Sequence, residues 1–129
     1  MKLPIYCYLT SWIILIQGII AYTYIPNDLT LSHIIMGATS VVHHNRRNKW
    51  YYYDINSFAD WIAVLNFIYQ IYLVFGSNIL IFILSYSIIH LILIFVLNIY
   101  DKLRLLTILH CSLHLYFIII IPKLYSLLL

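Results

Sequence analysis

Two histidines near the end of the chain are spaced so that one helix can present both of them to a metal ion. His110 and His114 stand four residues apart. Side chains at this spacing lie on the same face of a helix, one turn apart, and imidazole nitrogen is a common ligand of Zn²⁺. The spacing therefore predicts that His110 and His114 bind one metal ion together.

Further residues of suitable chemistry lie earlier in the chain. Ser40, His43 and His44 fall at the end of one apolar segment, and Asp54 and Asp60 fall at the start of the next. A catalytic zinc takes three protein ligands and a water molecule, and a nearby carboxylate can orient a ligand or accept the proton of that water. We predict that His43 or His44 completes the zinc site, with Asp60 or Asp54 as the carboxylate.

The composition indicates what kind of fold must position these residues. Hydrophobic residues make up 64% of the 129 residues and charged residues 9%, against about 45–50% and about 25% in typical globular proteins. So little polar surface excludes a soluble enzyme, and a net charge of +3 is too small for a nucleic-acid-binding module. We expect an all-α fold, a polytopic bundle of transmembrane helices that forms one domain over residues 1–129.

Five apolar segments are each expected to cross the membrane as a helix, although a span needs about 20 residues and the second segment is short. Turn-forming residues separate several of the segments, and Pro122 is expected to interrupt the last helix. The expected spans cover residues 3–24, 29–42, 55 (or 58)–75, 79–100 and 103–121.

The basic residues predict the orientation of these spans, because Lys and Arg favour the cytoplasmic side. With five spans, the N-terminus and the loops after the second and fourth spans share one side, which we expect to be cytoplasmic. The predicted ligands then meet near that membrane face. The basic residues on this side are Lys2, Arg46, Arg47, Lys49, Lys102 and Arg104, and Lys123 alone lies on the other.

The order of the polar residues resembles the CREST superfamily, which includes alkaline ceramidases, progestin/adipoQ receptors and hemolysin III-like proteins. The similarity covers Ser40 and the following histidines, Asp54 or Asp60, and the HxxxH motif of His110 and His114. It implies that three histidines bind zinc and that the Ser and Asp complete the site on the cytoplasmic side of a helical bundle. In this chain Ser40 is then expected to hydrogen-bond the water or the developing oxyanion.

The chain differs from this family in length and in two details of spacing. The family typically has seven spans, so this chain resembles a shortened member with five. Ser40 and His44 keep the usual spacing of four, whereas His43 would need Thr39 in place of Ser40. Both carboxylates fit some members, and we favour Asp60 because it lies deeper in its span. Its alternative role is an interfacial cap of the third helix.

The resemblance implies a zinc-dependent intramembrane hydrolase that cleaves an amide or ester of a membrane lipid, with a ceramide-like substrate. The alternative is a receptor-like or structural multispan protein without turnover, including a subunit of a larger membrane complex. We expect a lipid partner and no nucleic acid, and a homo-oligomer or larger complex would help to enclose a site built on five short helices. His33 and His90 stand apart from the motif, and hydrogen bonding to a neighbour is the expected role of such isolated histidines.

Overall fold

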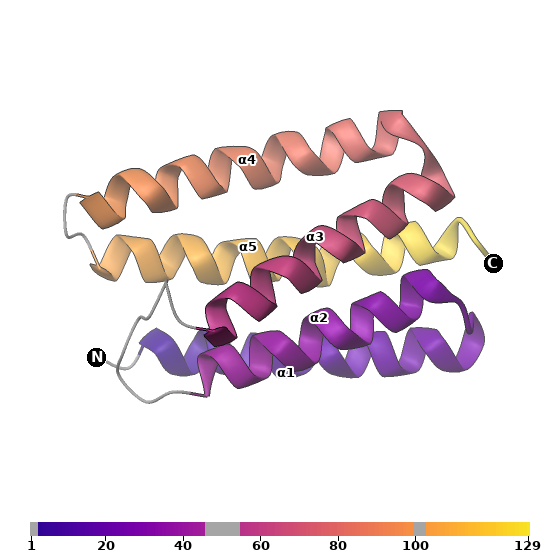
Figure 1. Ribbon diagram of the computed structural model, residues 1–129, viewed down its shortest axis with the longest axis horizontal. Coiled ribbons are helices and arrows are strands. Elements are labelled where there is room, and N and C mark those ends of the chain that lie inside the picture. Colours follow the sequence, from indigo (N-terminus) through magenta and orange to yellow (C-terminus); the bar gives the residue numbers. More distant parts are fainter. Residues whose placement is uncertain (1–2, 46–54, 100–102) are drawn as a thin grey trace.

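The computed structural model describes residues 3–45, 55–99 and 103–129, and in these ranges it contains helices and no strands. The all-α fold class is thus confirmed. The five helices are α1 (Leu3–Tyr24), α2 (Asp28–His44), α3 (Ile55–Phe75), α4 (Ser77–Ile99) and α5 (Leu103–Ser126), arranged as shown in Figure 1.

The helices form a closed ring. Each packs against its neighbours along the chain, and α5 closes the ring by packing against α1. Within the described residues no helix has backbone contact with a helix across the ring, so α2 and α5 meet only through their side chains. Helix α4 contacts α3 and α5 and lies at the edge of the bundle in Figure 1. The largest fully buried apolar side chains are Phe67, Leu29, Ile71, Ile83 and Ile121.

The helices have dimensions and surfaces that suit a membrane. In the part of the chain that the structure describes, three stretches are long and apolar enough to cross one: Ile5–Tyr24, Phe58–Phe75 and Ile108–Ser126. Large apolar side chains such as Ile16, Leu65 and Ile119 are exposed on the outside of the bundle, where lipid can cover them. The count of five spans and the cytoplasmic N-terminus stay predictions. Of the residues that fix this orientation, Lys2, Arg46, Arg47, Lys49 and Lys102 lie outside the described residues.

Two turns follow from local chemistry. Asn27 caps α2, because its side chain accepts a hydrogen bond from the Thr30 N–H at 3.0 Å while the Thr30 hydroxyl oxygen accepts one from the Asn27 N–H at 3.2 Å. Gly76 separates α3 from α4 with φ at +83°, a backbone conformation that glycine adopts at no steric cost. Both positions lie in the predicted turns.

Helix α5 differs from its sequence-based prediction, because Pro122 lies inside the helix and does not end it. Proline has no N–H, so the carbonyl oxygen of Ile118 loses its helical donor. Gln17 of α1 supplies a replacement, since its Nε2 donates to the Ile118 oxygen at 3.0 Å. A hydrogen bond between helices thus replaces one helical hydrogen bond of α5, which continues to Ser126, and gives the amide nitrogen of Gln17 a partner.

Helices α1 and α2 approach each other closely at Gly37. A Cβ atom added there would lie 2.6 Å from the Cα of Leu15, closer than such atoms normally come. Glycine therefore permits this approach. One turn further along, the same interface brings Ser11 of α1 and Ser40 of α2 within hydrogen-bond distance.

Candidate metal centre

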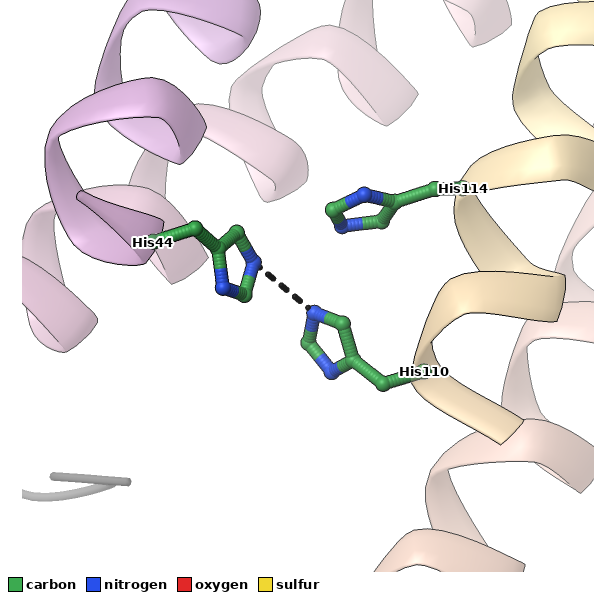
Figure 2. A group of neighbouring side chains, drawn as sticks. All are labelled: His44, His110 and His114. Atoms are coloured by element: carbon green, nitrogen blue, oxygen red, sulfur yellow. Dashed lines mark hydrogen bonds between the residues drawn. The ribbon is translucent and has the colours of Figure 1, made fainter. Parts of the chain in front are cut away.

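Three buried histidines point towards one another between α2 and α5, as Figure 2 shows. His44 comes from the last turn of α2, and His110 and His114 come from α5. Their exposed fractions are 8%, 8% and 6%. One ligand nitrogen from each residue lies within 4.8 Å of the others. Because α2 and α5 have no backbone contact, the imidazole rings themselves span the interior between these helices.

The rings are arranged edge to face around a common centre. The ring centroids of His110 and His114 lie 4.8 Å apart, as the predicted spacing of one helical turn requires. The His44 ring lies 4.8 Å from that of His110 and 5.1 Å from that of His114. His44 Nε2 and His110 Nε2 are 3.0 Å apart and form a hydrogen bond. One of these nitrogens therefore donates a proton and the other accepts it.

This arrangement fits a metal ion. Two nitrogens bound at about 2.0–2.1 Å to a tetrahedral ion lie roughly 3.3–3.4 Å from each other. The 3.0 Å separation of His44 Nε2 and His110 Nε2 is close to that value, and a metal ion would take the place of the proton that they share. Together with His114, this buried cluster can hold a metal ion.

His43 lies beside the cluster but faces a different direction from His44. Its ring centroid is 4.6 Å from that of His44, and its side chain is half-buried in the adjoining pocket. Consecutive residues of a helix point about 100° apart, so only one of this pair can face α5 squarely. His44 faces both residues of the HxxxH motif, whereas His43 forms a second group of potential ligands with His44 and Asp60.

Asp60 is the predicted carboxylate that the structure places at the site. It stands inside α3, five residues after Ile55, so it does not cap the helix. Its Oδ1 lies 3.2 Å from the Thr39 hydroxyl, whose single proton is shared between this oxygen and the Met36 carbonyl at 3.0 Å. The Asp60 side chain lines the same pocket as His110 and His114. Asp54, the alternative carboxylate, lies outside the described residues.

Ser40 is buried beside the cluster, and its hydrogen bonding shows what it can do there. Its Oγ lies 2.9 Å from Ser11 Oγ, and Ser11 Oγ lies 2.7 Å from the carbonyl oxygen of Cys7. A hydroxyl has one proton and a carbonyl only accepts. Ser11 thus donates to Cys7, which leaves Ser40 to donate to Ser11. Ser40 then has lone pairs, and no proton, to offer to the pocket.

A pocket of about 50 Å³ lies among these residues. A single water molecule needs a cavity volume of roughly 10–15 Å³, so the space holds a few water molecules. Its walls are mostly apolar and carry a few polar groups from α2, α3 and α5, a combination typical of small-molecule sites. The polar lining residues are Ser40, His43, Asp60, His110 and His114, and the apolar ones are Ile14, Met36, Trp61, Val64, Leu113 and Phe117.

Two hydroxyl residues at the site, Thr10 and Ser11, were not among the predicted residues, and Thr39 was named only as the alternative to Ser40 that His43 would need. Thr10 and Ser11 of α1 contact His114 and Ser40, and Thr39 of α2 contacts Asp60. Ser and Thr in a helix often bond their own backbone, so their types alone do not indicate a site. The adjacency of Thr10 and Ser11 in a predominantly apolar segment is the only sign of them in the sequence.

The structure describes the side chain of only one of the two isolated histidines, His33 and His90. His33 is fully buried, and its Nδ1 is hydrogen-bonded to the hydroxyl of Tyr125 at 2.8 Å. It lies 11 residues before His44 in α2, about 16 Å away along the helix axis. The expected hydrogen bond between His33 and a neighbouring side chain is thus confirmed. The His90 side chain lies outside the part that the structure describes.

Comparison of the chain with models of known protein families, with curated proteins and with solved structures finds no match. What the site can do is therefore inferred from its own residues.

Proposed function

We propose that the protein is a zinc-dependent intramembrane hydrolase that cleaves an amide or ester bond of a membrane lipid. The supporting observation is the buried triad of His44, His110 and His114 beside a pocket that Asp60 lines. Three imidazoles are a known ligand set of catalytic zinc, and they leave the fourth position to water. Imidazole suits several transition metals, and we propose zinc because this set serves hydrolysis without redox chemistry.

The residues of the site have distinct roles in this proposal. His44, His110 and His114 hold the ion, which when bound acts as a Lewis acid and makes a nucleophilic water available near neutral pH. Asp60 takes a proton from the attacking water, while Thr39 holds one carboxylate oxygen in place. Ser40, whose own proton is directed to Ser11, accepts a hydrogen bond from that water. This limits the expected role of Ser40, since it has no proton left for an oxyanion.

The reaction is a simple hydrolysis. The water oxygen bonds to the carbonyl carbon of the lipid, and the bond from that carbon to the amide nitrogen or ester oxygen breaks. The proton that Asp60 removes from water passes to the departing amine or alcohol, so the carboxylate returns to its starting state. The products are a fatty acid and the amine or alcohol that carried it.

A lipid substrate is supported by the surroundings of the pocket. Trp61 and Val64 of α3 and Leu113 and Phe117 of α5 form apolar walls, and both helices contain stretches of membrane-spanning length. Both helices line the pocket, so an acyl chain bound there would lie against these apolar side chains. The preference for ceramide-like lipids rests on the family resemblance.

We also propose that the five helices all span the membrane and that the site lies near the cytoplasmic face. His44 stands at the end of α2, Asp60 near the start of α3, and His110 in the second turn of α5. These positions share one end of the bundle. By the bias of the basic residues, that end is the cytoplasmic one.

Hydrolysis by metal-stripped and zinc-reloaded protein tests the proposal. The purified protein in detergent would be incubated with ceramides, other N-acyl lipids and lysolipids, and fatty acid release measured. We expect release by the reloaded protein and none by the stripped protein or by a His110→Ala variant. One bound zinc per chain without hydrolysis of any lipid would overturn the hydrolase and favour a receptor-like or structural protein.

A further inference from the structure

Thr10 of α1 contacts one of the three clustered histidines directly. Its Oγ1 lies 2.9 Å from His114 Nδ1, across the interface where α1 packs against α5. The direction of this hydrogen bond decides whether His114 can be a ligand. A neutral imidazole carries one N–H, and a nitrogen that carries this proton cannot bind a metal ion. The location of the Thr10 proton therefore sets the chemistry of His114.

The hydroxyl proton of Thr10 is engaged on the backbone of its own helix. Thr10 Oγ1 lies 2.8 Å from the carbonyl oxygen of Tyr6 and 3.0 Å from that of Cys7. Carbonyl oxygens only accept hydrogen bonds, so the single proton points towards them. The oxygen of Thr10 then meets His114 Nδ1 with a lone pair, and Nδ1 must carry the imidazole proton.

The Cys7 carbonyl lies next to this contact and agrees with the same assignment, because it can only accept a hydrogen bond and Thr10 Oγ1 donates towards it. Thr10 Oγ1 is near both the Cys7 oxygen and His114 Nδ1, so the protonated nitrogen faces α1. Figure 2 shows the other nitrogen of His114 turned towards His44 and His110.

We propose that Thr10 is a positioning residue of the metal centre, which accepts a hydrogen bond from His114 Nδ1–H and so keeps Nε2 unprotonated for the metal ion. This inference rests on the proposed function, because it assigns Thr10 a role at the same site. Metal-binding histidines usually donate their second N–H to an oxygen, which fixes the tautomer and the ring orientation. In this chain a threonine that bonds back to its own helix provides that oxygen.

The tautomer can be measured without any metal. In the metal-free protein labelled with ¹⁵N-histidine, two-dimensional NMR distinguishes Nδ1–H from Nε2–H rings, and a His114→Asn variant assigns the signal. We expect His114 to be the Nδ1–H form in the wild type and to gain Nε2–H character in Thr10→Val. A wild-type His114 in the Nε2–H form would overturn the proposal, whatever the protein binds.

Zinc affinity gives the second readout. Thr10→Val removes the hydroxyl at similar volume, and Thr10→Ser retains it. Thr23→Val is the matched control, since Thr23 is on the same helix and bonds back to the Ile20 carbonyl at 2.6 Å. In competition with a chelator we expect Thr10→Val to bind Zn²⁺ about 10–100-fold more weakly, with Thr10→Ser and Thr23→Val close to wild type.

The outcomes separate the two proposals. If the wild type binds zinc and Thr10→Val binds it equally tightly, Thr10 has no positioning role and the metal site stands. If the wild type binds no zinc, the proposed function fails, and the tautomer of His114 still decides the direction of the hydrogen bond. The wild-type NMR measurement also decides the matter if Thr10→Val does not fold.

Discussion

The side-chain amide of Gln17 in α1 donates a hydrogen bond to the carbonyl oxygen of Ile118 in α5, at 3.0 Å. This is the carbonyl that Pro122 leaves without a helical donor. The pairing joins the first and last helices of the ring next to the turns of α5 that carry the histidines. Two residues that each look unfavourable in an apolar helix thus compensate for each other.

Gln17→Leu is expected to lower the free energy of unfolding by about 1–3 kcal/mol, because it leaves the Ile118 carbonyl unsatisfied in an apolar interior. Pro122→Ala restores a backbone N–H to that carbonyl, so the double variant should be destabilised less than Gln17→Leu alone. Unfolding in detergent, measured for both single variants and the double variant, gives the coupling energy. Strict additivity of the two changes would show that the two residues do not compensate for each other.

Gly37→Ala is expected to separate α1 from α2, because the new Cβ would lie 2.6 Å from the Cα of Leu15. Overpacking of this kind typically costs about 1–3 kcal/mol. Gly18→Ala is the matched comparison, since its closest contact, to the Ile34 nitrogen, is 3.0 Å, and we expect it to cost less. Thermal unfolding in detergent measures both. Equal stability of Gly37→Ala and wild type would mean that the helices need not approach so closely.

His43→Ala and His44→Ala are expected to differ sharply in zinc binding. His44 faces both histidines of α5, whereas His43 lies to the side. We expect His44→Ala to lose zinc and His43→Ala to retain it, as measured by metal analysis after gel filtration. The two variants control for each other because they are adjacent in one helix. Retention of zinc by His44→Ala would contradict His44 as a ligand, and loss of zinc from both variants would assign the metal to the group of His43, His44 and Asp60.

Asp60→Asn is expected to retain zinc and to lower lipid hydrolysis by about 10²–10⁴-fold, the typical contribution of a general base. The amide has nearly the same shape as the carboxylate but cannot accept the proton of water. Metal content and fatty acid release would be measured on the same preparation. Wild-type turnover in this variant would contradict the role of Asp60 as the base, and loss of zinc would identify Asp60 as a ligand.

The sequence predicted the elements well where apolar runs end in strong turn formers. The first and third helices have the expected bounds. Asn27 caps the start of the helix that follows the first, and Gly76 separates the third helix from the fourth. The predicted end of the fifth helix at residue 121 was wrong, because the helix continues through Pro122 to Ser126. A hydrogen bond from another helix replaces the donor that Pro122 lacks. Such a bond depends on which faces meet in space, and a single segment does not show this.

The sequence indicated which residues could form the site, but not how residues from different helices would lie relative to one another. The HxxxH spacing fixes the relation of His110 to His114, because both lie on one helix. The choice between His43 and His44 depends on the rotation of α2 about its axis, which is set by its packing against α1 at Gly37. The contribution of Thr10 could not be predicted, because it arises from the closure of α5 on α1.

The metal content of the purified protein tests the central claim most directly. The wild type, His110→Ala and His33→Gln would be purified in detergent, exposed to Zn²⁺, freed of excess metal and analysed for zinc per chain. His33→Gln controls for the loss of a buried histidine, since His33 bonds Tyr125 and lies outside the cluster. We expect one zinc per chain in the wild type and in His33→Gln, and none in His110→Ala. Absence of zinc from the wild type, or its full retention in His110→Ala, would contradict a metal centre built on His44, His110 and His114.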